Sequence, residues 1–217
     1  MEPEQARRRM VSRLRDSGYI RSQRVADAMM AVPRHLFLPP EARENAYVDS
    51  PLHIGEGQTI SAPHMVAIMA EALDLRPGQR VLEVGGGSGC HAAVMAELVR
   101  PGGMVYSIER IPSLAEMARK NLMEAGYSSL VKVIEGDGTR GLPEHAPYDR
   151  ISVAAAAPDV PEPLKQQLAD EGRMLVPVGG SWHQDLVMVV RSKGRFHIEN
   201  LGGCIFVPLI GEHGHKP

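Results

Sequence analysis

From Gln79 onward, short apolar runs rich in β-branched residues alternate with amphipathic stretches of helical length. The apolar runs predict strands at 80–84, 104–109, 131–136, 149–155, 173–178, 185–191 and 196–201. The amphipathic stretches predict helices at 65–73, 90–100, 113–125 and 161–170. Strands that alternate with helices are typical of βαβ units, in which helices cover both faces of a parallel sheet. We therefore expect an α/β fold, doubly wound around a mostly parallel seven-stranded sheet.

The two ends of the chain depart from this alternation. The last predicted strands have little helix between them, so we expect an antiparallel C-terminal edge. Residues 1–60 read as helical pieces broken by proline and glycine. A chain of 217 residues suits one hydrophobic core, and no repeat or charged linker marks a boundary. We expect a single domain, 1–217, with 1–60 as an N-terminal helical extension and 61–217 as the core.

Composition excludes several classes of protein. The net charge of −2 gives no general attraction to nucleic acid. No apolar run approaches the roughly 20 residues of a membrane span, and the charged opening segment is not followed by the apolar stretch of a secretory signal. Cys90 and Cys204 are isolated, which argues against disulfides and thiolate zinc sites. We expect a cytoplasmic protein with no membrane or nucleic-acid partner and no metal, and we expect a monomer.

Three further features have plain interpretations. The arginines of the opening segment, between Arg7 and Arg15, are interpreted as the solvated face of a helix. Trp182 is interpreted as a loop or packing aromatic rather than a platform for substrate. His213 and His215 lie in a polar C-terminal tail of the kind that is usually disordered, so they are not interpreted as metal ligands.

The strongest local motif is VLEVGGGSGC, which places glycines directly between a predicted strand and a predicted helix. Glu83, Gly85, Gly87 and Gly89 form an ExGxGxG pattern. Glycines there allow a sharp turn and let a ligand touch the backbone. A plain glycine-rich turn is the alternative. Cys90 occupies the place where the dinucleotide fingerprint needs glycine, and no Lys-Ser or Lys-Thr follows, so dinucleotide and P-loop sites are disfavoured.

Two acidic positions end the next two predicted strands. Glu109 lies at the end of the second strand, where a carboxylate accepts hydrogen bonds from both hydroxyls of a ribose. Asp137 and Gly138 end the third strand, where a carboxylate and a backbone N–H suit an adenine ring. The alternatives are a solvated strand-end charge and an ordinary Asp-Gly turn. Taken together, the three strand ends favour a nucleoside without phosphates.

S-adenosyl-L-methionine is such a ligand, and the arrangement resembles the class I methyltransferase fold, which is Rossmann-like. Enzymes of this fold that methylate amino groups usually carry an Asn/Asp-Pro-Pro-aromatic motif after the fourth strand. This chain has VAAAAPD there, at 153–159. Cytosine C5 methyltransferases carry a Pro-Cys nucleophile, and neither cysteine follows a proline. Both subclasses are therefore disfavoured.

Longer motifs extend the resemblance to nearly the whole chain, from about residue 7 to residue 211. They are VPRHLFLP, AYVDSPLHIG, GQTISAPHM, IERIPSLAEMARKNL, GDGTRGLPEHAPYDRI and FVPL. With them the chain resembles the protein-L-isoaspartate O-methyltransferases. The resemblance implies transfer of a methyl group from S-adenosyl-L-methionine to the free α-carboxylate of an L-isoaspartyl residue in a damaged protein or peptide. The product is S-adenosyl-L-homocysteine, and the ester then permits cyclisation to a succinimide and return to aspartate, which is protein repair.

The resemblance also implies a set of site residues. It makes Ser61 the catalytic serine and residues 1–60 a substrate-side extension. The expected cofactor-binding residues are Gln58, Thr59, Ile60, Ser61, His64, Glu83, Gly85, Gly87, Gly89, Glu109, Arg110, Asp137 and Gly138. The chain departs from the family pattern at Gly86, Cys90 and Ala154, where Thr, Tyr and Thr are usual.

Ser61 has a second interpretation. It stands just before Ala62 and Pro63, where a helix N-cap belongs. If it instead meets substrate, the hydroxyls of Thr59 and Ser61 and the unpaired N–H groups of the helix start at 58–64 would hold a carboxylate. Two other functions stay open: a non-catalytic sensor of adenosine nucleosides, and a methyltransferase for RNA or a small molecule.

Overall fold

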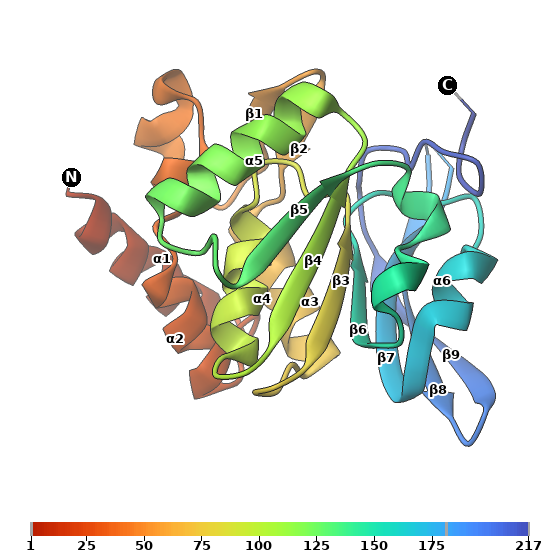
Figure 1. The fold of residues 1–217 in the computed structure, drawn as a ribbon. Helices are drawn as coiled ribbons and strands as arrows, with labels where there is room; N and C mark the ends of the chain where they lie inside the picture. Colours follow the sequence, from red (N-terminus) through yellow and green to blue (C-terminus); the bar gives the residue numbers. More distant parts are fainter. Residues whose placement is uncertain (1, 181, 217) are drawn as a thin grey trace.

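The computed structural model describes residues 2–180 and 182–216 and contains a central seven-stranded sheet (Figure 1). Its strands are β3 (Arg80–Val84), β4 (Met104–Glu109), β5 (Val131–Glu135), β6 (Tyr148–Val153), β7 (Leu168–Gly179), β8 (Gln184–Ser192) and β9 (Arg195–Gly203). Their order across the sheet is β5-β4-β3-β6-β7-β8-β9. The first five strands of that order are mutually parallel, and β8 and β9 are antiparallel to their neighbours. The predicted doubly wound sheet and its antiparallel edge are confirmed.

Helices cover both faces of the sheet (Figure 1). They are α1 (Pro3–Asp16), α2 (Gln23–Ala31), α3 (Pro63–Leu73), α4 (Cys90–Val99), α5 (Pro112–Glu124) and α6 (Glu162–Gln167), with short 3-10 helices η1 (Arg34–Phe37), η2 (Pro40–Asn45), η3 (Gly138–Arg140) and η4 (Pro143–His145). One hydrophobic core joins the sheet to α1 through α5, and a second joins its other face to α6 and the C-terminal segment. None of the helices in the described part of the chain has the length and apolar character that crossing a bilayer requires.

Helix α6, which lies between β6 and β7, is shorter than the sequence predicts. A helix is expected over 161–170, but α6 ends at Gln167 and β7 begins at Leu168. The buried Gln167 side chain accepts a hydrogen bond from the Leu142 N–H and donates one to the Arg140 carbonyl. This pairing anchors the end of α6, and Leu168 then pairs with Tyr148 in the sheet.

A two-stranded hairpin replaces part of the expected helical extension. Its strands are β1 (Leu52–Gly55) and β2 (Gln58–Ile60), and they are antiparallel. Glu56 and Gly57 form the turn with φ of +53° and +67°, the signs that a tight I′-type hairpin turn requires. The hairpin therefore delivers the segment 58–61 to the edge of the sheet where the parallel strands end.

Residues 212–215 of the C-terminal tail are held by hydrogen bonds, which corrects the expectation of disorder for this segment. The N–H groups of Glu212 and His213 donate to Asp137 Oδ2 and Thr139 Oγ1 at 2.8 and 3.1 Å. The His215 N–H donates to the Leu209 carbonyl at 2.7 Å. The tail is thereby held against the turn that follows β5. No three His, Cys, Asp or Glu side chains of the described residues gather as a metal site.

Candidate active site

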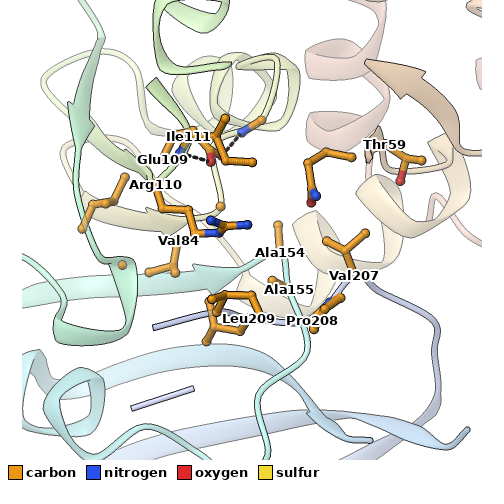
Figure 2. Close-up of a pocket in the computed structure, with 16 residues that line it drawn as sticks. Thr59, Val84, Glu109, Arg110, Ile111, Ala154, Ala155, Val207, Pro208 and Leu209 are labelled. Carbon is orange, nitrogen blue, oxygen red and sulfur yellow. Dashed lines mark hydrogen bonds between the residues drawn. The ribbon is translucent and has the colours of Figure 1, made fainter. Parts of the chain in front are cut away.

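A pocket opens at the carboxyl ends of β3, β4 and β6, where the strand order reverses (Figure 2). Open α/β sheets bind ligands at this switch point. We call it the strand-tip pocket. It is lined by Gln58, Thr59, Val84, Gly85, Gly87, Ile108, Glu109, Arg110, Ile111, Gly138, Ala154, Ala155, Val207, Pro208, Leu209 and Ile210.

The glycine-rich turn between β3 and α4 forms one wall of the strand-tip pocket. Gly85 and Gly87 line it with φ of +88° and +54°, a backbone conformation that side chains disfavour. Gly89 has φ of +87° and starts α4, and a Cβ there would lie 3.1 Å from Leu122 of α5. The first two glycines therefore shape the pocket, whereas Gly89 allows two helices to pack closely.

Glu109 holds this wall together from the end of β4. Its side chain is buried, with Oε2 accepting the Gly87 N–H at 2.8 Å and Oε1 accepting the Ile111 N–H at 2.9 Å. Figure 2 shows both bonds as dashed lines. Each carboxylate oxygen accepts about two hydrogen bonds, so each keeps one free acceptor position beside the pocket. Two carboxylate oxygens side by side can accept hydrogen bonds from the two neighbouring hydroxyls of a ribose.

The Asp137 carboxylate already accepts three hydrogen bonds within the protein. Its Oδ1 accepts from the N–H and the hydroxyl of Thr139, and its Oδ2 accepts from the Glu212 N–H. Partial burial raises the pKa of Asp137, but these hydrogen bonds and nearby Arg140 outweigh it, so the net pKa lies below the usual value. Asp137 lies in a neighbouring groove, and only Gly138 of this pair lines the strand-tip pocket.

A second pocket contains Ser61 and adjoins the first. We call it the serine pocket. It is lined by Pro51, Thr59, Ser61, Ala62, His64, Met65, Ala154, Trp182, His183, Gln184, Gly203, Cys204, Ile205, Phe206 and Val207. Three of these residues, Thr59, Ala154 and Val207, also line the strand-tip pocket. The two pockets therefore share a wall, and no aspartate or glutamate is among the described residues that line the serine pocket.

Ser61 does not cap helix α3. The N-cap is Ala62, which gives no side-chain hydrogen bond, and the Ser61 hydroxyl has no partner within residues 2–180 and 182–216. The donors expected at the helix start are also used. Asp49 Oδ1 accepts the His64 N–H at 2.8 Å and lies 2.9 Å from His64 Nδ1, while the Met65 N–H bonds to the Ala62 carbonyl. The N–H groups of His64 and Met65 are therefore unavailable to a ligand, whereas the Ser61 hydroxyl faces the serine pocket as a donor.

Comparison with known proteins agrees with this geometry. The family model described as "Protein-L-isoaspartate(D-aspartate) O-methyltransferase (PCMT)" matches residues 5–214. The chain belongs to this family. A protein-L-isoaspartate O-methyltransferase of Methanopyrus kandleri is 61% identical over 97% of this chain and 94% of its own length. One of Methanothrix thermoacetophila is 61% identical over 96% of each chain.

A solved structure supports the same assignment. The putative protein-L-isoaspartate O-methyltransferase of Plasmodium falciparum, in complex with S-adenosyl-L-homocysteine, superposes with a TM-score of 0.86. It is 28% identical and covers 94% of this chain and 98% of its own. The class I methyltransferase fold expected from the sequence is confirmed.

The structure separates the predicted cofactor-binding residues of this family member into three groups. Gln58, Thr59, Gly85, Gly87, Glu109, Arg110 and Gly138 line the strand-tip pocket. Ser61 and His64 line the serine pocket. Ile60, Glu83, Gly89 and Asp137 line neither: Ile60 is buried in the hairpin, Glu83 lies fully buried beneath the glycine turn, and the other two are described above.

Sequence patterns do not mark one part of the pocket wall. The segment 207–210 closes the strand-tip pocket on one side, held by hydrogen bonds from the Ala156 N–H to the Val207 carbonyl and from the Leu209 N–H to the Ala156 carbonyl, both 2.8 Å. FVPL was a family motif, but it carried no chemical groups that point to a site. Apolar strand ends such as Val84 and Ile108 were missed for the same reason.

The residues present fit an adenosine-containing methyl donor. The turn at Gly85 and Gly87 has no side chains, and Glu109 offers two acceptor oxygens. Ile108, Ile111 and Leu209 add apolar surface. These suit a close backbone approach, a ribose diol and a flat aromatic ring respectively.

Proposed function

We propose that this chain methylates the free α-carboxylate of L-isoaspartyl residues in damaged proteins and peptides. The observation that supports it best is the shared wall of the two pockets at Thr59, Ala154 and Val207. A donor in the strand-tip pocket would face an acceptor carboxylate in the serine pocket. Membership of the family and the absence of acidic side chains among the described residues lining the serine pocket also support this substrate.

The residues of the serine pocket position the carboxylate rather than activate it. An α-carboxyl group has a pKa of about 3.5, so it is ionised at neutral pH and needs no general base. Thr59 and Ser61 offer neutral hydroxyl donors that hold the carboxylate. A cationic donor would hold it more tightly but would withdraw electron density from the attacking oxygen. Neutral donors preserve the nucleophile while they orient it.

The strand-tip pocket holds the donor through Glu109, whose two free acceptor positions suit the ribose hydroxyls, and through Gly138, which suits the adenine. Asp137 keeps one acceptor position on Oδ2 for an amino group. When bound, S-adenosyl-L-methionine supplies a methyl group whose bond to the cationic sulfur breaks as the carboxylate oxygen takes the methyl carbon. The apolar wall of 207–210 would exclude water from the site where the positively charged sulfur and the negatively charged carboxylate approach each other.

Residues 1–60 complete the substrate side of what we regard as one catalytic domain, 1–217. Asp49 fixes the start of α3 beside Ser61, and the hairpin carries Gln58 and Thr59. Arg24 of α2 donates to the carbonyls of Leu75 and Leu98, at 2.7 and 2.8 Å, which ties the extension to the core.

We further propose that the protein acts as a monomer in the cytoplasm without nucleic acid. Its net charge of −2 and its two free cysteines, Cys90 and Cys204, support this setting. Light scattering after size exclusion measures the oligomeric state directly.

Transfer of labelled methyl groups tests the proposed function. An isoaspartyl hexapeptide should be methylated, whereas its aspartyl twin and an RNA should not. Label on the aspartyl twin at an equal rate would refute the proposal, and label on RNA alone would assign a different acceptor.

The variant Ser61→Ala tests the role of the serine. Loss of one hydrogen bond to a charged group costs about 1.5–3 kcal/mol, so kcat/KM for the isoaspartyl peptide should fall about 10- to 100-fold. The affinity for S-adenosyl-L-homocysteine should stay within about twofold, because Ser61 lines the serine pocket alone. Ser12→Ala, an exposed serine on α1, serves as the matched control. An unchanged kcat/KM in Ser61→Ala would dismiss the role assigned to Ser61.

A further inference from the structure

Two large apolar side chains stand almost fully in solvent at the serine pocket. Trp182 is 100% exposed and Ile205 is 93% exposed, and both line the pocket that contains Ser61. Among the described residues they are the two most exposed large apolar side chains. Trp182 lies in the loop between β7 and β8, as the sequence suggests, but it packs on no core. Exposed apolar groups gathered at a binding site indicate an interaction surface.

The segments that carry these two side chains are held in a fixed arrangement. Gln184 is buried, and its side chain accepts the Phe206 N–H at 2.7 Å and donates to the Phe206 carbonyl at 3.0 Å. Its main-chain carbonyl also accepts the Cys204 N–H at 2.9 Å. The loop with Trp182 leads into Gln184, so one residue joins it to the segment that presents Ile205. Hydrogen bonds therefore fix Gln184 against Cys204 and Phe206, the residues on either side of Ile205.

The chemistry of the serine pocket changes from its floor to this rim. Thr59 and Ser61 both provide hydroxyls, Thr59 at the wall shared with the strand-tip pocket, and the rim formed by Trp182 and Ile205 is aromatic and aliphatic. An isoaspartyl carboxylate at Ser61 leaves the neighbouring residues of its peptide outside the polar floor. Two residues of extended chain span about 7 Å. Because Ser61 and the rim line one pocket, side chains within about two residues of the isoaspartyl group are the ones expected at the rim.

We infer that Trp182 and Ile205 form an apolar rim that binds a bulky apolar side chain within two residues of the isoaspartyl group. The inference rests on the proposed function and gives that site a sequence preference. The occupant is a segment of the damaged polypeptide, because the rim continues the acceptor pocket and faces no acidic side chain among its described lining residues. Apolar burial between the rim and this side chain supplies affinity without contributing to the methyl transfer itself.

Tryptophan fluorescence tests the contact directly, because Trp182 is the only tryptophan among the 217 residues. The protein, saturated with S-adenosyl-L-homocysteine, is titrated with an isoaspartyl hexapeptide that has leucine on both sides of the isoaspartyl group. The emission should shift to shorter wavelength and saturate as the indole leaves water. A twin peptide with serine in both places should bind about tenfold more weakly, since it buries less apolar area. Saturable binding of the leucine peptide with no change in emission would overturn the inference.

Methylation kinetics supply an independent readout. For the wild type, the KM of the serine peptide should exceed that of the leucine peptide by about tenfold, with similar kcat. In Trp182→Ser and Ile205→Ser this ratio should fall toward one. Met123→Ser is the matched control, because Met123 is 68% exposed on α5 and does not line the serine pocket.

The outcomes distinguish a failure of the apolar rim from a failure of the proposed function. Equal KM values for the two peptides in the wild type, or a ratio that both rim variants preserve, would overturn the rim alone. Methylation of neither peptide would overturn the proposed function and the rim with it.

Discussion

Glu83 lies beneath the glycine-rich turn, beside His91 of α4, and neither side chain lies in a pocket. Glu83 Oε2 accepts a hydrogen bond from Ser107 Oγ at 2.5 Å, and Oε1 lies 3.5 Å from His91 Nδ1. Burial raises the pKa of Glu83 to about 8, and the charge on Glu109 acts in the same direction while the Ser107 bond opposes it. Burial lowers the pKa of His91 to about 4. Both groups are therefore neutral in the folded protein near pH 7.

This neutral pair predicts how stability depends on pH. Between pH 6.5 and 8 the folded chain retains the Glu83 proton that the unfolded chain has released, so raising the pH favours unfolding. His91 acts in the opposite sense only below pH 6.5, where the unfolded chain binds its proton. From pH 6.5 to 8, the wild type should lose up to about 2 kcal/mol of unfolding free energy relative to Glu83→Gln. Urea unfolding at these two pH values measures the difference.

Glu116→Gln, which changes an exposed carboxylate on α5, is the control for the pH experiment. It should follow the wild type at both pH values. Parallel curves for the wild type and Glu83→Gln would show that Glu83 is ionised in the folded protein.

Glu109 carries a second prediction. Glu109→Ala removes both ribose acceptors and also the partners of the Gly87 and Ile111 N–H groups. Binding of S-adenosyl-L-homocysteine should weaken by about 1.5–3 kcal/mol, the usual contribution of hydrogen bonds to a charged group. Isothermal calorimetry measures this loss. Glu109→Gln keeps one acceptor oxygen and should lose less, and undiminished binding by Glu109→Ala would remove Glu109 from the ribose site.

At this scale, the sequence indicates which residue types could serve a site but not the direction in which each side chain points. Alternate residues of a strand point to opposite faces, so Val84 reaches the pocket while the more chemically suggestive Glu83 turns toward α4. Asp137 was recognised as an acceptor, but its bond to Glu212 comes from a tail distant in sequence. No local pattern carries that information.

At the scale of elements, β3, β4, β6 and β8 were predictable because each contains an apolar run, whereas the first residues of β7 were expected to be helix and β9 is exposed along its whole length. The β1–β2 hairpin was not predictable, since Glu56 at a position with positive φ lacks the usual Asn-Gly or Asp-Gly signal. The hairpin matters for the site because it carries Thr59. Family motifs identified Thr59 where secondary-structure signals did not.

The glycine-rich turn packs closely against Ser107 of β4 at Gly86. A Cβ at this position would collide with Ser107 Oγ, so the threonine that the family resemblance implies here does not fit beside Ser107. Gly86→Thr should destabilise the protein by about 1–3 kcal/mol through overpacking. In a Ser107→Ala background the cost should fall by about 1 kcal/mol or more, because the two sites are in contact. Thermal unfolding of the four proteins of this cycle measures the coupling, and simple additivity would contradict it.

At the scale of the whole molecule, the active site is assembled from the extension, the core and the C-terminal segment. The hairpin supplies Thr59, the parallel strands supply Gly85 and Glu109, and the segment 207–210 closes the wall. The position of the site, at the point where the strand order reverses, follows from a general rule of α/β folds. The closing wall depends on pairing between residues 156 and 208, which sequence patterns do not reveal.

The central claim is that the two adjoining pockets hold a methyl donor and an isoaspartyl carboxylate face to face. A crystal structure of the protein with S-adenosyl-L-homocysteine and an isoaspartyl peptide tests it most directly. The ribose should contact Glu109, the sulfur should face the wall formed by Thr59 and Ala154, and the peptide carboxylate should accept a hydrogen bond from Ser61. Adenosine bound outside the strand-tip pocket, or a carboxylate out of reach of Ser61, would contradict the account.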